Sequence, residues 1–157
     1  MPVERLKKFL DDAKIRYVTI LHSPAYTAQE IAATAHVSGR ELAKTVIVKV
    51  DGKMAMAVLP ASSHVEFDML RDALGAKKVE LASESEFKDL FPGCEPGAMP
   101  PFGNLYDMDV YVADSLAQDA EIAFNAGSHT ELIKLAYQEF ARLVEPKVLR
   151  FAAQNVA

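Results

Sequence analysis

The chain has 157 residues, and its 17 Lys and Arg against 22 Asp and Glu give a formal net charge of −5. Half of the residues are hydrophobic and a quarter are charged, as in a folded protein with one core, and no apolar run approaches the roughly 18 residues of a membrane-spanning helix. The single cysteine, Cys94, excludes an internal disulfide, and the charged first residues are unlike a signal peptide. We therefore expect a single domain over residues 1–157, a cytoplasmic location and no membrane partner.

The first third of the chain predicts a helix, a strand and two further helical segments. Apolar residues recur at spacings of three and four over residues 3–13, which indicates one face of a helix. Residues 16–21 are rich in β-branched and aromatic side chains and predict a strand. Thr27 and Glu30 form a capping box that starts a helix through Ala35, and Ser38 and Glu41 suggest one more helical turn.

A β-hairpin is the clearest signal in the sequence. Two apolar runs, 45–50 and 53–59, flank Asp51-Gly52, a pair that favours a two-residue turn because both positions accept positive φ. This turn sets Val50 opposite Lys53 and Lys44 opposite Leu59. Because both faces of the pair carry apolar side chains, we expect the hairpin to be covered on both sides.

The rest of the chain alternates short helices and strands. We expect a helix over 68–74 ending at Gly75, a strand over 79–82, and a helix that a Ser83/Glu86 capping box opens and Pro92-Gly93 closes. Strands are predicted over 108–112 and 121–124, whereas 130–144 fits a helix or, in its first half, a strand paired with 121–126. The absence of a regular βαβ rhythm favours the α+β class.

Lys44 is the most informative candidate for chemistry. It begins a strand in phase with Val46 and Val48, on a face where Ala55 and Ala57 leave open volume. A lysine at the mouth of such a cavity is suited to positioning an acyl or phosphate group. The competing interpretation is a lysine whose stem packs on the core while its ammonium reaches water, and the pattern by itself favours that interpretation.

Two glycine-containing segments are further candidates. Residues 93–103 hold three Gly and three Pro, so their backbone can approach a ligand and present stiffened N–H groups as an oxyanion site, or can form a purely structural loop. Residues 125–130 follow an apolar strand; Asn125 and His129 can bond a ribose or an amino acid there, unless the segment is only a hairpin turn.

Other reactive side chains give weaker signals. The four histidines have no metal-ligand spacing, so we expect no metal site, and the sequence lacks the glycine-rich phosphate-binding and dinucleotide-binding motifs, so we expect no cofactor. Cys94 lies in the Gly/Pro loop, but no nearby residue identifies a base that would activate its thiol.

Taken together, these segments resemble the YbaK/prolyl-tRNA synthetase-associated domain family over residues 3–150. The resemblance is carried by Ala43-Lys44-Thr45 before an apolar strand, by Gly97-Ala-Met-Pro-Pro-Phe-Gly103, and by Phe124-Asn-Ala-Gly-Ser-His-Thr130. The segment from His22 to Glu30 is also similar to the start of that family. The resemblance implies a mixed, barrel-like β-sheet flanked by helices, with 121–136 as strand, turn and strand before a helix.

The same resemblance implies a trans-editing aminoacyl-tRNA deacylase that acts on the 3′ end of tRNA carrying a small amino acid. Lys44 would orient the substrate end and the loop from Gly97 to Gly103 would hold the ester carbonyl, with water or a substrate group as nucleophile. The expected substrate contacts are His22, Tyr26, Thr45, Ala98, Met99, Pro100, Asn125, Gly127 and His129.

Two alternatives to this function stay open. One is a non-catalytic module that binds tRNA or an aminoacyl-tRNA synthetase, and the other is a thiol-dependent hydrolase that uses Cys94. The acidic balance argues against binding long nucleic acid by charge, since such binding needs clustered Lys and Arg. A substrate taken only by its 3′ end needs a local cluster, for which Lys44, Arg40 and Lys49 are the candidates.

Overall fold

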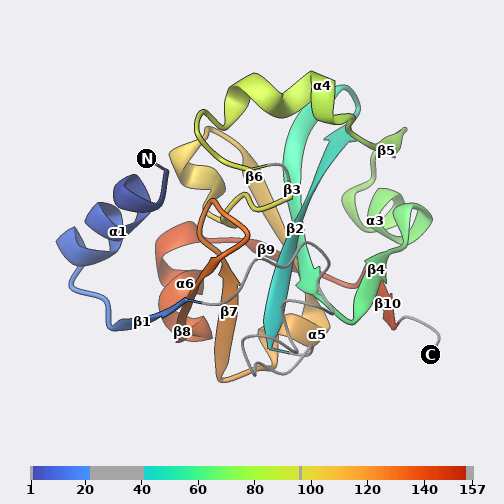
Figure 1. Cartoon of the computed structure of the whole chain (residues 1–157). Coiled ribbons are helices and arrows are strands. Elements are labelled where there is room, and N and C mark those ends of the chain that lie inside the picture. The colour runs from blue at the N-terminus through green and yellow to red at the C-terminus, as the bar shows by residue number, and fades with distance from the viewer. Residues whose placement is uncertain (1, 22–40, 96, 155–157) are drawn as a thin grey trace.

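The computed structural model describes residues 2–21, 41–95 and 97–154, and within these the chain forms a mixed sheet flanked by helices (Figure 1). The helices are α1 (Pro2–Asp12), α3 (Phe67–Leu74), α4 (Glu84–Phe87), α5 (Asp114–Ala117) and α6 (Tyr137–Val144), with short 3₁₀ segments at Lys88–Leu90 and Gly103–Leu105. The strands are β1 (Tyr17–Leu21), β2 (Leu42–Val50), β3 (Lys53–Pro60), β4 (Ser63–Val65), β5 (Val79–Leu81), β6 (Asp109–Ala113), β7 (Glu121–Asn125), β8 (Glu131–Ala136), β9 (Lys147–Leu149) and β10 (Ala152–Gln154).

The large sheet has the strand order β1-β8-β7-β2-β3-β6-β9, and β5 pairs with the far end of β2. Strands β2 and β7 run parallel, as do β3 and β6, whereas β7 and β8 form an antiparallel hairpin. The predicted α+β class and mixed sheet flanked by helices are therefore confirmed. The capping-box segments predicted at Thr27 and Ser38 fall on residues 22–40, outside the described part of the chain.

The hairpin of β2 and β3 has the predicted register. Val50 pairs with Lys53 and Lys44 with Leu59, and both turn residues have positive φ, 50° at Asp51 and 87° at Gly52. The two faces enter different hydrophobic clusters, as the alternation of side chains along a strand requires. One face contributes Ile47, Met56 and Val58 to the main core, and the other contributes Val48, Ala55, Ala57 and Leu59 to a second cluster under α3.

Residues 131–136 form β8, so the helical interpretation of this segment is wrong and the strand implied by the family resemblance is confirmed. Residues with helical periodicity, Leu132 and Leu135, are both buried here because β8 lies between β1 and β7 and is covered on both faces. Helix α6 starts only at Tyr137. The predicted elements at 3–13, 16–21, 68–74, 79–82, 108–112 and 121–124 are each present within one or two residues.

Several short elements have no counterpart in the sequence-based expectations. Strands β4, β9 and β10 are three residues each, and α5 has a single turn, so none of them is long enough to show a hydrophobic period.

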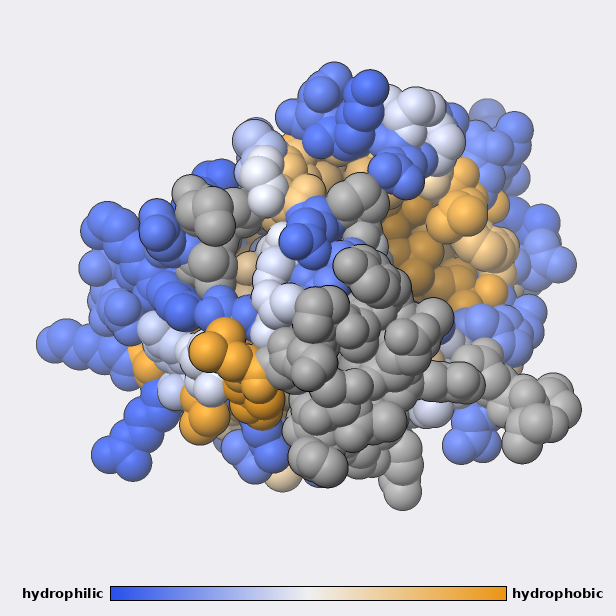
Figure 2. All heavy atoms as spheres, in the orientation of Figure 1, coloured by the Kyte–Doolittle hydropathy of each residue, from blue (hydrophilic) through white to orange (hydrophobic). Residues whose placement is uncertain are grey.

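Edge strand β1 carries apolar atoms to the surface (Figure 2): Val18 is 59% exposed and Leu21 76%. No helix in the described ranges is long and apolar enough to cross a bilayer.

Candidate active site

The Gly/Pro loop is anchored in the main core by its apolar side chains. Phe102 is fully buried, with its ring centroid 5.4 Å from those of Phe124 and Phe140 and 6.1 Å from that of Phe9 on α1. Met99 is buried in the same cluster. Aromatic contacts of this kind fix both position and orientation, so the loop backbone is held at a defined place beside the sheet.

Backbone hydrogen bonds join this loop to the turn between β7 and β8. The Gly127 N–H donates to the Ala98 carbonyl at 2.9 Å, and the Glu95 N–H donates to the Gly127 carbonyl at 2.9 Å. Within the loop, the Ala98 N–H donates to the Glu95 carbonyl at 3.0 Å. Two segments that lie about thirty residues apart in the sequence therefore form one structural unit.

Glu95 ties the same two segments together through its side chain. Its Oε2 accepts a hydrogen bond from the His129 backbone N–H at 2.7 Å and lies 3.9 Å from His129 Nε2. The His129 ring is buried, and its Cε1 is 3.7 Å from the point where a Cβ on Gly97 would lie. Glu95 is not among the site residues predicted from the sequence, where it is marked only as a charged side chain in a loop of glycines and prolines.

Lys44 lies next to the turn through the pairing of β2 with β7. Ala43 pairs with Phe124, so the following residues on the two parallel strands are Lys44 and Asn125, and both side chains start on the face opposite the main core. Lys44 is partly buried and makes no ion pair within the described ranges, and its burial lowers the pKa of its ammonium from the usual value. The buried Oδ1 of Asn125 has no hydrogen-bond partner there either.

The expected site residues fall into three groups. The first group lies where the loop and the turn join and contains Gly97, Ala98, Gly127 and His129. The second is Lys44 beside Asn125. The third is Thr45, which is on the opposite face of β2, the face that packs on the main core to which Met99 belongs. Gly103 and Pro100 are buried, and a Cβ on Gly103 would come within 2.5 Å of the Met108 carbonyl oxygen, so Gly103 closes the loop by packing. His22 and Tyr26 lie outside the described residues.

The expectation that Lys49 extends the positive cluster around Lys44 is wrong. The Lys49 ammonium lies 2.6 Å from Glu86 Oε2 and 3.4 Å from Glu80 Oε1, and the side chain projects from the opposite face of β2. The hydrogen bonds that Lys49 donates to these carboxylates raise the pKa of its ammonium and keep its charge paired. Arg40, the other expected member, is among the residues that are not described.

Cys94 lies at the start of the loop in surroundings that do not activate a thiol. Its Sγ is 4.0 Å from Tyr106 Oη, and burial raises the pKa of the thiol above its usual value. A raised pKa lowers the thiolate fraction at neutral pH, and the thiolate is the nucleophilic form. The geometry therefore gives no support to a thiol-dependent hydrolase.

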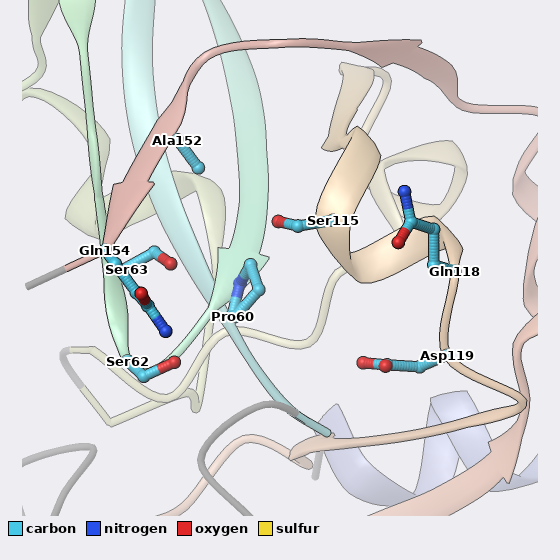
Figure 3. Close-up of a pocket in the computed structure, with 8 residues that line it drawn as sticks. All are labelled: Pro60, Ser62, Ser63, Ser115, Gln118, Asp119, Ala152 and Gln154. Atoms are coloured by element: carbon cyan, nitrogen blue, oxygen red, sulfur yellow. The ribbon is translucent and has the colours of Figure 1, made fainter.

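A pocket of about 350 Å³ lies between the β3–β4 turn, α5 and β10 (Figure 3), and its lining residue Pro60 pairs with Ala43, the residue before Lys44. One side is lined by Ser62, Ser63 and Gln154. The other side is lined by Ser115 of α5 and by Gln118 and Asp119, which follow that helix. None of the expected site residues lines this pocket. Within the described ranges, no group of three or more His, Cys, Asp or Glu side chains is placed to hold a metal ion.

Comparison with known proteins assigns these features to one family. The family model for the aminoacyl-tRNA editing domain matches residues 22–143, which include Lys44, the loop and the turn. The multifunctional Ser/Thr-tRNA deacylase ProXp-y of Escherichia coli K12 is 33% identical over 115 residues, covering 69% of this chain and 68% of that protein.

Two further matches show where the same domain occurs. A proline–tRNA ligase of Bacillus mycoides KBAB4 is 28% identical over 89 residues, which are 57% of this chain and 16% of the ligase. A crystal structure assigned provisionally to a trans-editing enzyme for prolyl-tRNA synthetase superposes with a TM-score of 0.82 at 16% identity, over 97% of each chain. The structural match shows the shared fold, and the ligase match shows that the domain also exists as part of a synthetase.

Proposed function

This chain belongs to the aminoacyl-tRNA editing domain family, and from that premise we propose that it is a trans-editing hydrolase that removes a small amino acid from mischarged tRNA. The observation that carries the proposal is the joining of the 97–103 loop to the 125–130 turn, next to Lys44. A separate editing enzyme is useful for small amino acids because a binding pocket gains only about 1–3 kcal/mol of discrimination per methylene. We further propose that residues 1–157 act as a single editing domain.

The loop backbone supports the role of holding the ester carbonyl. Pro100 and Pro101 have no N–H, and the Ala98 N–H already donates to Glu95, so Gly97 is the exposed loop residue with an amide left for substrate. The positive φ of 81° at Gly97 turns the backbone there, and a preorganised amide stabilises an oxyanion without reorganisation during the reaction. Gly97 is thus the proposed oxyanion donor, with Ala98 and Met99 supporting the conformation of the loop.

Lys44 supports the role of orienting the tRNA end. Its ammonium has no carboxylate partner in the described structure, and it lies beside Asn125, whose Oδ1 is likewise unpaired there. An unpaired ammonium and amide oxygen are suited to a phosphate and a ribose hydroxyl of the terminal nucleotide. We include Gly127 and His129, which follow Asn125 in the same turn, among the proposed substrate contacts, together with Thr45, His22 and Tyr26 from the family resemblance.

The reaction that this arrangement serves is hydrolysis of the ester between the amino acid and the ribose. The oxygen of water, or first a substrate hydroxyl or thiol, bonds to the carbonyl carbon while the Gly97 amide stabilises the oxyanion. The bond from that carbon to the ribose oxygen then breaks. When water attacks, one of its protons goes to the ribose oxygen and the other to solvent, and the amino acid leaves as a carboxylate. When a substrate hydroxyl or thiol attacks first, its proton goes to the ribose oxygen, and water then hydrolyses the new ester or thioester to the same carboxylate. Such a mechanism needs no nucleophile from the protein.

The test is a panel of tRNAs mischarged with alanine, cysteine, serine or threonine, incubated with catalytic amounts of protein. We expect at least one to be deacylated, and we expect Lys44→Ala to reduce that rate by at least tenfold. Lys53→Ala is the matched control, because Lys53 is an exposed lysine on the neighbouring strand. Failure to deacylate any of the four, or full activity in Lys44→Ala, would contradict the proposal.

A second candidate function is a non-catalytic module that binds tRNA or a synthetase. It is favoured by the occurrence of the same domain within a proline–tRNA ligase, which suggests a synthetase as partner. The same panel separates the two functions, because a binding module releases at most one amino acid per protein molecule. More than ten turnovers per molecule would exclude it.

A further inference from the structure

Glu95 places a negative charge two residues before Gly97, the proposed oxyanion donor. Its side chain is half exposed although its Oε2 is held by the His129 N–H at 2.7 Å. The other oxygen, Oε1, has no ion-pair or hydrogen-bond partner in the described structure. The carboxylate is therefore fixed in position by one oxygen while the other is left for a ligand.

A cationic ligand is the chemical complement of this oxygen. Lys44, the other charged residue assigned to the site, has the opposite sign and is not within 4 Å of Glu95. The site thus presents one anionic and one cationic group at separate places. A substrate that binds both groups carries a positive charge close to its scissile bond, for Glu95, and a negative charge farther away, for Lys44.

An aminoacyl ester of tRNA has this distribution of charge. Its α-ammonium is attached to the carbon next to the ester carbonyl, and its nearest negative charge is the phosphate on the far side of the ribose. Glu95 precedes Gly97 by only two residues. Glu95 accepts a hydrogen bond from the His129 N–H, and the His129 ring lies 3.7 Å from the point where a Cβ on Gly97 would be. A carbonyl held by the Gly97 amide would therefore bring the ammonium to the Glu95 side of the loop.

We infer that Glu95 is a specificity-determining residue whose Oε1 accepts a hydrogen bond from the α-ammonium of the aminoacyl ester. The inference rests on the proposed function and adds the substrate group that Glu95 recognises. The enzyme then selects esters with a free amino group over esters whose amino group is acylated, as in peptidyl-tRNA. Charge-assisted hydrogen bonds of this type are about twice as strong as neutral ones, so the selection is substantial.

The experiment compares seryl-tRNA with N-acetylseryl-tRNA at pH 6.5, where the amino group is protonated, and divides each rate by its uncatalysed rate. We expect the wild-type protein to favour seryl-tRNA by at least tenfold. Glu95→Gln keeps an oxygen that accepts from the His129 N–H but removes the charge. It should lower kcat/KM on seryl-tRNA about tenfold and leave the N-acetyl substrate within about twofold.

The matched control is Glu86→Gln. Glu86 also accepts a hydrogen bond from a backbone N–H, that of Ser83 at 2.9 Å, but it belongs to α4 and its other partner is Lys49, which is outside the proposed site. It should leave the preference between the two substrates unchanged. An equal loss on both substrates in Glu95→Gln would show a structural role and overturn the inference. Failure of the wild-type protein to hydrolyse seryl, alanyl, cysteinyl or threonyl esters would overturn the proposed function instead.

A second measurement needs no substitution and so cannot be confused with misfolding. Alanyl-tRNA is compared with the lactyl ester of the same tRNA, in which a hydroxyl replaces the α-ammonium at nearly the same volume. We expect the wild-type protein to favour the alanyl ester by at least tenfold after correction for uncatalysed hydrolysis. Equal acceleration of the two esters would overturn the inference while leaving the deacylase function intact.

Discussion

Two glycines of one loop serve different purposes at the scale of single residues. Gly103 is buried, and a Cβ there would lie 2.5 Å from the Met108 carbonyl oxygen and 2.6 Å from Val110 Cγ2. Gly97 is exposed and has a φ of 81°. A Cβ there would lie 3.7 Å from His129 Cε1, an ordinary van der Waals distance. The first glycine is required by packing and the second by backbone conformation.

Alanine at each position should therefore separate stability from activity. Gly103→Ala forces the backbone of Met108 to move and should reduce the free energy of unfolding by about 1–3 kcal/mol. Gly97→Ala adds a left-handed alanine, costing about 1–2 kcal/mol, and tilts the proposed oxyanion amide. Urea unfolding and deacylation rates measure the two effects. A Gly97→Ala protein with full activity would remove that residue from the oxyanion role.

The residue that the sequence could not reveal is Glu95. Lys44 and Gly97 were found because a lysine beginning an apolar strand and a glycine-rich loop are unusual in themselves. The importance of Glu95 arises from a contact with His129, which is 34 residues away in the chain. That contact exists only because Phe102 anchors the loop and β7 pairs with β2, and neither is a property of the local sequence.

At the scale of elements, some structures follow from the local sequence and others depend on tertiary contacts. The Asp51-Gly52 turn and the Ser83/Glu86 capping box are local chemistry, and both formed as predicted. Residues 131–136 are different, because Leu132, Ile133 and Leu135 are all buried, and a strand covered on both faces has no clear period. Pairing with β1 and β7 selects the strand. The residue pattern left helix and strand both open, and the family resemblance favoured the strand.

The capping box of α4 leads to a prediction about acid stability. Hydrogen bonds from Lys49, then from the backbone and side chain of Ser83, lower the pKa of Glu86 to about 2. A carboxylate whose folded pKa is depressed contributes stability above its unfolded pKa of about 4.5, and loses that contribution as the pH falls toward 2. Between pH 4.5 and 2, the Glu86→Gln protein should therefore bind fewer protons on unfolding than the wild-type protein does, by at most about one proton.

Urea unfolding followed at several pH values measures this effect, since the slope of stability against pH counts the protons bound on unfolding. Glu84→Gln is the control, because Glu84 is the first residue of the same helix and, among the described residues, forms no ion pair with Lys49. Identical pH profiles for wild-type protein and Glu86→Gln would show that the Lys49 contact does not persist in solution.

At the scale of the whole molecule, the distribution of charge limits how the protein holds RNA. The net charge is −5, and many cations are already neutralised by carboxylates on neighbouring elements. Lys7 lies 3.2 Å from Glu131, Lys134 lies 3.7 Å from Glu41, and Lys49 is paired with two glutamates. About half of the described Lys and Arg side chains are paired in this way, and the overall excess of carboxylates opposes binding of the phosphates of a tRNA body.

A short RNA hairpin that carries only the acceptor end should consequently replace the full tRNA as substrate. We expect its seryl ester to be hydrolysed with kcat/KM within about threefold of that of seryl-tRNA, because the ester, the terminal ribose and one or two phosphates provide the contacts. Counterion release of about 0.7 per phosphate of a single strand then limits the slope of log(kcat/KM) against log salt to about −1.5. Both substrates are compared between 50 and 300 mM salt, with uncharged tRNA as competitor. A hundredfold loss on the hairpin, a steeper slope or strong competition by uncharged tRNA would show that the acidic protein recognises the tRNA body after all.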